Sequence, residues 1–380
     1  MEENQKEIKP LILDLLKDLV VKIRIKQRIS EQMETKSMSN ATESIDFIIT
    51  WVDGNDPMWQ AEKARYQEKR SGDNRNFRYR EWDTLRYWFR GVEKFAPWVN
   101  KVFFVTWGHL PPWLNTEHPK LKIVNHKDYI PAEYLPTFSS RTIDMNFHRI
   151  EDLSEHFVYF NDDMFLLQPT KKEDFFVNGL PCDMAVLDLP RISVRDRDGK
   201  TRKGDSIFLA DIIGTAVINE HFKKKEVIKK HFFKWYSPKY GRWVFKTMSL
   251  ALWDRFSNFR LTHVPYSYLK STYSDVWNEE PDLLDSASRN KFRKNYDVNH
   301  WIFTYWQFAK GTFVPRRFDV AKYMYIKNDG NENLYKCIEE ARYKMLCIND
   351  ENTSDCYEVE KQKLLSAFEK ILPEQSEYEK

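Results

Sequence analysis

The stretch from Ile45 to Trp59, IDFIITWVDGNDPMW, decides which fold the sequence predicts. Its first six residues are mainly apolar, and the chain then passes through Trp51 into two aspartates, a glycine and a proline. A short apolar run bounded by polar residues is typical of a buried strand that ends in a turn. Because open parallel sheets bind ligands at the carboxyl ends of their strands, the polar end is either a simple turn or one wall of a site.

Three further runs have the same character, at 101–106 (KVFFVT), 121–124 (LKIV) and 156–160 (HFVYF). Between the first two strands, residues 83–98 repeat apolar side chains at helical spacing until Pro97 ends the pattern. An order of strand, helix and strand predicts a parallel sheet with right-handed crossovers. We therefore predict an α/β fold, Rossmann-like, with a mainly parallel sheet, flanking helices and an α-rich insertion at about residues 190–260.

Polar residues follow each of the four predicted strands. They are Trp51–Gly54, Trp107–His109, Asn125–Asp128 and Asn161–Asp163. Since the carboxyl ends of parallel strands meet at one edge of a sheet, we expect these four clusters to converge on a shared rim.

The composition of the 380 residues is that of a globular protein, with 42% hydrophobic and 31% charged residues. A formal net charge of only +3 gives no indication of nucleic-acid binding. Four cysteines without a CxxC pair argue against a zinc site and a disulfide scaffold. The acidic start contains no signal peptide, and no apolar run reaches the roughly 20 residues of a membrane span, so we expect a cytoplasmic protein.

The first 32 residues predict an amphipathic helix that begins near Pro10. Basic residues between Lys17 and Arg28 allow it to lie on an anionic membrane surface, and packing on its own domain or on a partner subunit is an equal alternative. Residues 33–44 are predicted to be a linker, and 45–380 the main domain. Within the insertion, HFKKKEVIKKHFFKWY (221–236) predicts a basic helix, either a solvated face or a docking site for an acidic acceptor.

The sharpest chemical motif is YFNDDMF, in which Asp162 and Asp163 follow a predicted strand. Two adjacent carboxylates are costly to hold together unless a cation or hydrogen-bond donors neutralise them. Mg²⁺ (or Mn²⁺), shared with substrate phosphates, would explain the pair, and the alternative is a turn capped by Asp162. A second motif, CINDEN, supplies Asn349 and Asp350, which are able to complete the same cation shell.

A histidine and two arginines could serve phosphate chemistry. His263 precedes Pro265 and is a candidate general base, while Arg289 and Arg293 are candidates for a guanidinium clamp on phosphate oxygens. The sequence contains no Walker loop, GxGxxG, HExxH or GxSxG motif. Kinases, dinucleotide dehydrogenases and serine hydrolases are therefore disfavoured.

Taken in order, these motifs resemble the four conserved regions of the Stealth family. The resemblance is carried by IDFIITWVDGNDPMW, LRYWFRGVEKFAPWVNKVFFVTWGHLPPWL, the segment ending in YFNDDMFL, THVPYSYLKS through SRNKFRKNYDVN, and CINDEN. It runs from about Ile45 to Glu379. The family comprises bacterial capsular polysaccharide phosphotransferases and the animal enzyme that begins the mannose-6-phosphate tag of lysosomal proteins.

The resemblance implies a glycosyltransferase-A-like fold and the transfer of sugar 1-phosphate from a UDP-sugar to a hydroxyl of an acceptor glycan, with release of UMP. It implies His263, Arg293 and Asp163 as catalytic residues. Substrate binding is assigned to Trp51, Asp53, Gly54, Arg86, Arg90, His148 and Arg149. A divalent cation, Mg²⁺ or Mn²⁺, is assigned to Asp162, Asp163, Asn349 and Asp350.

Two departures from the family pattern leave the sugar and the acceptor open. Thr84 stands where the family often has an acid, and Asp144 stands where it often has glutamate. Two other functions stay open as well: an ordinary glycosyltransferase that releases UDP, and a non-catalytic glycan-binding subunit. The expected partners are the UDP-sugar, a polysaccharide or oligosaccharide acceptor, and a membrane surface or capsule assembly complex at the inner face of the plasma membrane, with no nucleic acid.

Overall fold

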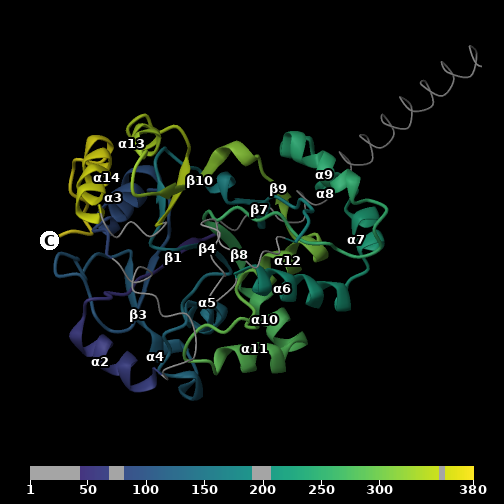
Figure 1. Cartoon of the computed structure of the whole chain (residues 1–380), viewed down its shortest axis with the longest axis horizontal. Coiled ribbons are helices and arrows are strands. Elements are labelled where there is room, and N and C mark those ends of the chain that lie inside the picture. The colour runs from purple at the N-terminus through teal and green to yellow at the C-terminus, as the bar shows by residue number, and fades with distance from the viewer. Residues whose placement is uncertain (1–42, 68–80, 191–206, 351–355) are drawn as a thin grey trace, which may run out of the picture. The chain divides into compact units, whose positions relative to one another are not determined.

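The computed structural model describes residues 43–67, 81–190, 207–350 and 356–380 (Figure 1). The compact unit to which they belong begins at Ser44. The predicted first helix, nearly all of the predicted linker and the first part of the predicted insertion lie outside the described residues. Among the described residues, no helix is both long and apolar enough to cross a bilayer.

The central sheet has five strands in the order β3-β2-β1-β4-β8. Its first four strands are parallel, and β8 pairs with β4 in the antiparallel sense. The strands are β1 (Ile45–Thr50), β2 (Val102–Thr106), β3 (Leu121–Asn125), β4 (His156–Phe160) and β8 (Tyr266–Leu269). All four predicted strands are found within one residue of their predicted bounds, so the mainly parallel α/β class is confirmed.

Two smaller sheets were not predicted. One has the order β10-β11-β5 and the other β6-β7-β9. Their strands are β5 (Met164–Leu166), β6 (Phe176–Val177), β7 (Leu180–Asp183), β9 (Val314–Pro315), β10 (Ala321–Ile326) and β11 (Met345–Asp350). In the first of them, β11 runs antiparallel to β5 with Cys347 opposite Met164. This pairing brings the CINDEN motif beside the NDD motif.

Helices surround these sheets, and the described part of the insertion is helical as predicted (Figure 1). In the first half of the chain they are α2 (Pro57–Tyr66), α3 (Leu85–Phe95), α4 (His126–Tyr129) and α5 (Ser140–Met145). The insertion contains α6 (Ile207–His221), α7 (Lys224–Lys230), α8 (Phe232–Trp235) and α9 (Val244–Ser249). The last part contains α10 (Lys270–Glu279), α11 (Pro281–Ser288), α12 (Trp301–Lys310), α13 (Glu332–Glu339) and α14 (Tyr357–Ile371).

Helix α3 shows how the sequence pattern becomes packing. Its apolar residues Trp88, Phe89 and Val92 are buried, as the helical spacing predicts. A Cβ atom on Gly91 would lie only 3.0 Å from the carbonyl oxygen of Leu166 in β5. The helix therefore lies directly on β5, and only glycine allows this approach.

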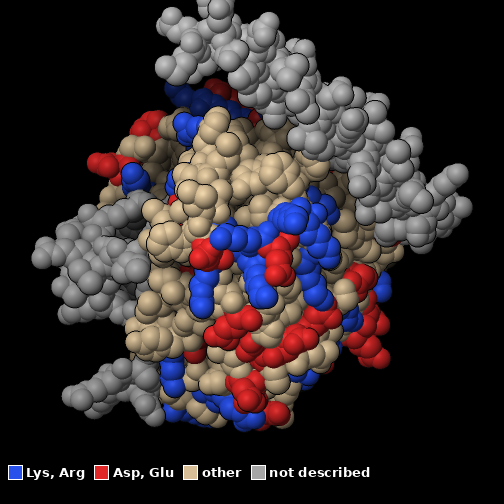
Figure 2. Space-filling model, turned by 90° about the vertical axis from the view of Figure 1, so that its right-hand side faces the viewer, with Lys and Arg blue, Asp and Glu red and all other residues tan. Residues whose placement is uncertain are grey.

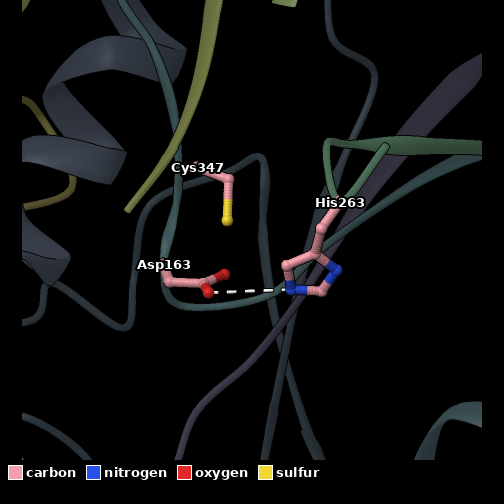
Figure 3. A group of neighbouring side chains, drawn as sticks. All are labelled: Asp163, His263 and Cys347. Atoms are coloured by element: carbon pink, nitrogen blue, oxygen red, sulfur yellow. Dashed lines mark ion pairs between the residues drawn. The ribbon is translucent and has the colours of Figure 1, made fainter. Parts of the chain in front are cut away.

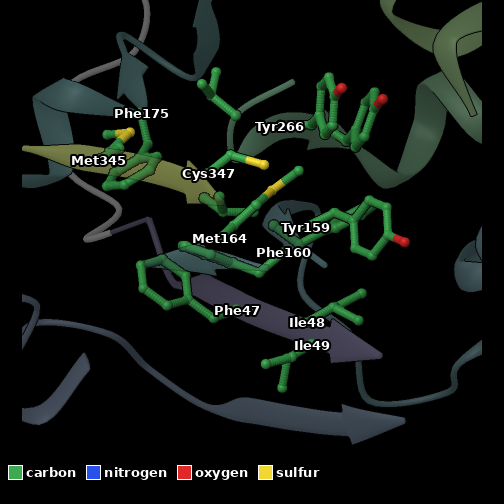
Figure 4. Packing of buried hydrophobic residues seen from close by; sticks show 14 of the residues in the cluster. Phe47, Ile48, Ile49, Tyr159, Phe160, Met164, Phe175, Tyr266, Met345 and Cys347 are labelled. Atoms are coloured by element: carbon green, nitrogen blue, oxygen red, sulfur yellow. The ribbon is translucent and has the colours of Figure 1, made fainter. Parts of the chain in front are cut away.

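The core joins the central sheet to the sheet of β5 and β11 (Figure 4). Phe47 of β1 and Phe160 of β4 are fully buried, with ring centroids 4.8 Å apart. Met164 and Cys347 are fully buried as well. Burying a large apolar side chain stabilises a fold by about 1.5–3 kcal/mol. Packed together in one core, these side chains hold the sheet of β5 and β11 against the central sheet.

Candidate active site

Three distant segments of the chain bring Asp163, His263 and Cys347 together (Figure 3). Asp163 follows β4, His263 precedes β8, and Cys347 lies in β11. The Nε2 atom of His263 is 3.6 Å from Oδ2 of Asp163, and the potential ligand atoms of the three residues lie within 4.8 Å of one another. The predicted catalytic pair is therefore adjacent, and it lies at the carboxyl end of β4, where the sheet topology predicts a site.

The strand pairings explain this meeting. Because β8 is antiparallel to β4, the segment that enters β8 lies beside the segment that leaves β4. On the other side, the amide of Ile348 donates to the carbonyl oxygen of Asp163 at 2.8 Å. The NDD turn is thus held between His263 and β11 by backbone geometry, which is more rigid than a loop would be.

Hydrogen bonds orient the ring of His263. Its Nε2 atom lies 3.1 Å from the side-chain amide of Asn161, and its Nδ1 atom lies 3.0 Å from the hydroxyl of Tyr266. The indole of Trp301 donates to the same hydroxyl at 3.0 Å. When the Asn161 amide donates to Nε2, the ring proton resides on Nδ1 and is donated to Tyr266. This is the tautomer in which Nε2 can accept a proton.

A buried polar chain continues inward from Asn161. The hydroxyl of Tyr159 contacts the Asn161 side chain and donates to Oδ1 of Asp144 at 2.8 Å. Asp144 is only 4% exposed. Burial raises the pKa of Asp144 to about 7, although the Tyr159 hydrogen bond and nearby Arg293 favour its charged form. The row of hydrogen-bonded side chains that begins at Asn161 therefore ends at Asp144, a carboxyl whose pKa lies near neutral pH.

Asp162, beside Asp163, lies among further carboxylates. The residue is exposed to solvent, but its carboxyl is partly desolvated by the surrounding protein. This desolvation first, and then the charges of Asp163 and Glu81, raise the pKa of Asp162 to about 8. Burial likewise raises the pKa of Glu81, whose carboxylate accepts from the indole of Trp51 at 2.8 Å. Sequence reasoning missed Glu81, because an acid in a polar stretch carries no pattern of its own.

Asp162, Asp163 and Asn349 offer the oxygen atoms that a hard divalent cation takes, whereas the potential ligand atoms that lie within 4.8 Å of one another belong to Asp163, His263 and Cys347. The Oδ1 atom of Asp163 is buried and has no hydrogen-bond partner among the described residues. Asn349 lies two residues after Cys347 in β11 and therefore shares its face of the strand. Burial, followed by the charge of Asp163, raises the pKa of the Cys347 thiol well above its ordinary value, so the thiol is neutral. Oxygen ligands from Asp162, Asp163 and Asn349 are what Mg²⁺ prefers.

Asp350 is the last residue of β11 and the strand neighbour of Asn349. Successive residues of a strand face opposite sides. Its place in the same cation shell as Asn349 stays a prediction.

Arg293 lies close to the carboxylates, as predicted. Its guanidinium donates to the hydroxyl of Ser140 at 2.5 Å, and its charge partly offsets the rise in pKa that burial causes at Asp144 and Asp162. Arg141, which is buried, donates to the carbonyl oxygens of Lys294 and Asp297 and so fixes the loop that carries Arg293. Arg289, by contrast, pairs on the surface with Asp285 of its own helix.

The carboxyl ends of β1 and β2 also meet, as predicted. The amide of Asp53 donates to Nε2 of His109 at 2.8 Å, and the ring of His109 lies against Trp51. Gly54 accepts a hydrogen bond from Gln60 through its carbonyl oxygen. Trp51 reaches Asp162 through Glu81, which makes this rim continuous with the carboxylate cluster.

The polar cluster after β3 is different. The side chain of Asp128 accepts from the amide of Asn125, which closes a capping box on α4. Its polar groups thus serve the local helix, although the cluster also lies at the rim, because Asn125 pairs with Thr106 at the end of β2 and a Cβ atom on Gly108 would lie 3.7 Å from the Oδ1 atom of Asn125.

Arg90 is not at the substrate rim, contrary to prediction. It is buried, and its guanidinium donates to both carboxylate oxygens of Glu379, at 2.8 and 3.0 Å. Further donations go to the carbonyl oxygens of Leu372 and Pro373. Arg90 therefore anchors the C-terminal segment to α3, because its donors are already used inside the protein.

Three other predicted binding residues lie against tryptophans. Arg86 is exposed, and its guanidinium lies 5.3 Å from the ring centre of Trp113. Arg149 lies 4.8 Å from the ring centre of Trp277 in α10, and His148 packs on the same ring. Burial lowers the pKa of His148 to about 3, so this ring is neutral. None of these contacts joins the three residues to the Asp163 cluster.

A second cluster of potential ligands, Glu93, His118 and Glu377, has a simpler explanation. The amide of Lys120 donates to Nδ1 of His118, so the ring proton of the neutral form resides on Nε2. Nε2 faces Glu377 at 3.7 Å. The ring nitrogen that faces the acids is thus protonated, which suits a hydrogen bond and not a metal.

Comparison with known proteins agrees with the motifs. Residues 43–71 match the family model for Stealth protein CR1, conserved region 1, and residues 78–182 match that for Stealth protein CR2, conserved region 2. A protein named capsular polysaccharide phosphotransferase WcwK from Streptococcus pneumoniae is 39% identical over 343 residues, covering 89% of this chain and 98% of that protein. The chain belongs to the Stealth family.

Other relatives cover the chain to a similar extent. A receptor polysaccharide phosphotransferase, WefC, from Streptococcus gordonii is 38% identical over 89% of this chain and 99% of its own length. An exopolysaccharide phosphotransferase, cps2G, from Lactiplantibacillus plantarum is 36% identical over 88% of this chain and 96% of its own. The solved apo structure of the bifunctional glycosyltransferase WbbM aligns with a TM-score of 0.31 and 11% identity over 87% of this chain and 52% of that one, a likeness too weak to support an argument.

Proposed function

We propose that this chain is a polysaccharide phosphotransferase that moves sugar 1-phosphate from a UDP-sugar to a hydroxyl of an acceptor glycan. The proposal is supported by the relatives, which are named capsular, receptor and exopolysaccharide phosphotransferases. The single structural observation that carries it is the contact of His263 with Asn161 and Asp163 at the end of β4. A base beside a carboxylate cluster is what phosphoryl transfer to a hydroxyl requires.

His263 is the proposed general base. Its Nε2 atom takes the proton of the acceptor hydroxyl, while Tyr266 holds Nδ1 and so fixes the ring. The acceptor oxygen then forms a bond to the phosphorus nearer the sugar, and the bond from that phosphorus to the UMP oxygen breaks. The C1–O bond of the sugar stays intact, so its anomeric configuration is retained.

Arg293 and the carboxylates are proposed to manage the charge of this step. The guanidinium, held by Ser140, neutralises charge that develops on the transferring phosphoryl group. Asp162, Asp163 and Asn349 would hold Mg²⁺ or Mn²⁺, and the bound cation would supply charge neutralisation at the phosphates. Trp51, Asp53 and Gly54 are proposed to line the donor side of the rim. We place the reaction at the cytoplasmic face of the membrane, where UDP-sugars are used.

The proposal is tested by release of UMP from a set of UDP-sugars in the presence of acceptor and Mg²⁺. We expect the wild-type chain to release UMP, and the Asp163→Asn variant to lose about 100-fold or more of that rate. Asp275→Asn is the matched control, because Asp275 pairs on the surface with Lys310 of α12. Full activity of Asp163→Asn would contradict the proposed site, and release of UDP in place of UMP would favour an ordinary glycosyltransferase.

A further inference from the structure

Four large apolar side chains on and after α9 face solvent. Phe245 is 67% exposed, Met248 53%, Leu252 94% and Trp253 65%. We call these four residues the α9 ridge. Single exposed apolar residues are ordinary, but four within nine residues form a contiguous group that marks an interaction surface.

The ridge has a fixed shape. Phe245 and Met248 are three residues apart and therefore lie on one side of α9, and Leu252 and Trp253 follow in the turns after its end. Beneath the turn, the ammonium of Lys224 in α7 donates to the carbonyl oxygens of Leu250 and Trp253. Lys224 is 1% exposed, so this anchor is internal and holds the ridge in place.

The segment that carries the ridge is basic. Residues 223–255 contain ten Lys and Arg against two acidic residues, a formal charge of +8, whereas the whole chain carries only +3. Lys229 and Lys230 of α7 are exposed, and Lys225 pairs with Asp254 directly after Trp253. In Figure 2, which looks onto the side where Figure 1 places α7 and α9, blue Lys and Arg side chains, with some red Asp and Glu among and below them, lie beside a broad tan area without charge.

We propose that the α9 ridge inserts into an anionic lipid surface, with the basic residues of α7 bound to the headgroups. Apolar side chains that project beside Lys and Arg are the two components of interfacial membrane binding. Tryptophan favours the interface, and each basic residue near an anionic surface adds to the attraction. This binding is independent of the proposed transfer reaction.

A lipid surface fits the ridge better than other occupants. A sugar-binding platform needs flat aromatic faces with polar partners, whereas the most exposed member here is an aliphatic leucine. A second copy of the chain would bring the same positive charge to the interface, and like charges repel. An anionic membrane complements both the apolar and the charged components.

The test is cosedimentation of the full-length protein with vesicles of phosphatidylcholine, with or without phosphatidylglycerol. We expect binding only with phosphatidylglycerol, and weaker binding as salt rises. The double variant Leu252→Ser/Trp253→Ser and the double variant Lys229→Glu/Lys230→Glu should each weaken it by about tenfold or more. Val359→Ser, with Val359 57% exposed on α14, and Lys336→Glu, with Lys336 exposed on α13, are the matched controls.

Each result decides for or against the proposal. Loss of binding in both double variants, with controls and melting temperatures unchanged, supports it. Unchanged binding in both double variants overturns it. So does a wild-type chain that is dimeric by light scattering and becomes monomeric in Leu252→Ser/Trp253→Ser without binding vesicles. Because UMP release from a soluble acceptor should be the same in Leu252→Ser/Trp253→Ser as in the wild type, failure here is distinguishable from failure of the proposed reaction.

Discussion

Arg90 and Asp163 were both assigned to the active site from the sequence, and the charged clusters around them differ in structure. Around Arg90, a buried guanidinium meets Glu379 and backbone carbonyl oxygens, and the pKa of Glu379 is lowered chiefly by its hydrogen bond to Arg90, against its burial. Around Asp163, carboxylates crowd together, the pKa of Asp162 is raised to about 8, and one buried oxygen has no partner among the described residues. A cluster whose charges are satisfied internally stabilises the fold, whereas one whose charges are unsatisfied is prepared for a ligand.

The strongest test of this contrast is His263→Ala. Loss of a general base typically lowers a rate by about 100- to 10,000-fold, so we expect UMP release to fall by that factor while the melting temperature is unchanged. The measurement is UMP release together with thermal unfolding. His221→Ala is the matched control, because His221 is an exposed residue that pairs with Glu280. Equal losses of activity in the two variants would remove His263 from the mechanism.

Arg90→Met should give the opposite result. It leaves the carboxylate of Glu379 buried without its partner, which costs about 3–5 kcal/mol of folding stability. Chemical denaturation measures this loss, and the surviving folded protein should release UMP at nearly the wild-type rate. If Arg90→Met were as stable as the wild type and failed to bind the UDP-sugar, Arg90 would be a substrate-binding residue after all.

Because of Asp144, the folding stability of the protein should depend on pH. In the unfolded chain its carboxyl loses its proton near the ordinary pKa of 3.8, whereas the folded chain keeps the proton until about pH 7. Stability should therefore fall as pH rises through this window, by about 2 kcal/mol between about pH 5 and about pH 8. Asp144→Asn should remove this contribution and leave the fall that Asp162 adds in the same window, as denaturation at both pH values without divalent cations would show. An equal fall in both proteins would mean that Asp144 is charged when folded.

The smallest expected effect is a difference in reactivity between two cysteines, of which Cys347 lies beside Asp163. Cys347 is fully buried and its thiol pKa is raised, whereas Cys356 is partly exposed. We expect an alkylating reagent to modify Cys356 at least about tenfold faster than Cys347 in the folded protein. Mass spectrometry of the modified peptides measures both rates. Equally fast modification would show that β11 opens beside Asp163.

The sequence predicted four of the five strands of the central sheet because they are continuous apolar runs, and it did not predict β8. It did not predict β5 and β10, because one is only three residues long and the other mixes lysine and tyrosine with apolar residues. Cys347 was treated as one of four scattered thiols, since its place beside Asp163 depends on the antiparallel pairing of β11 with β5.

Arg90 shows a second limit. It lies four residues after Arg86, on the same side of α3, so spacing assigns both to one surface. Only the packing of the C-terminal segment, almost 300 positions further along the chain, covers one and leaves the other exposed. Glu81 is the opposite case: it was not assigned to the site, yet it lies there. Its position depends on Trp51 and Asp162, which only the fold brings next to it.

The central claim is that the Asp163 cluster transfers sugar and phosphate together. The most direct measurement labels the phosphorus nearer the sugar in the UDP-sugar and follows it by phosphorus NMR in the presence of acceptor. Our account predicts that the label appears in a phosphodiester of the acceptor with UMP as the other product, and that His263→Ala abolishes this signal. Label that leaves entirely with UDP would contradict it.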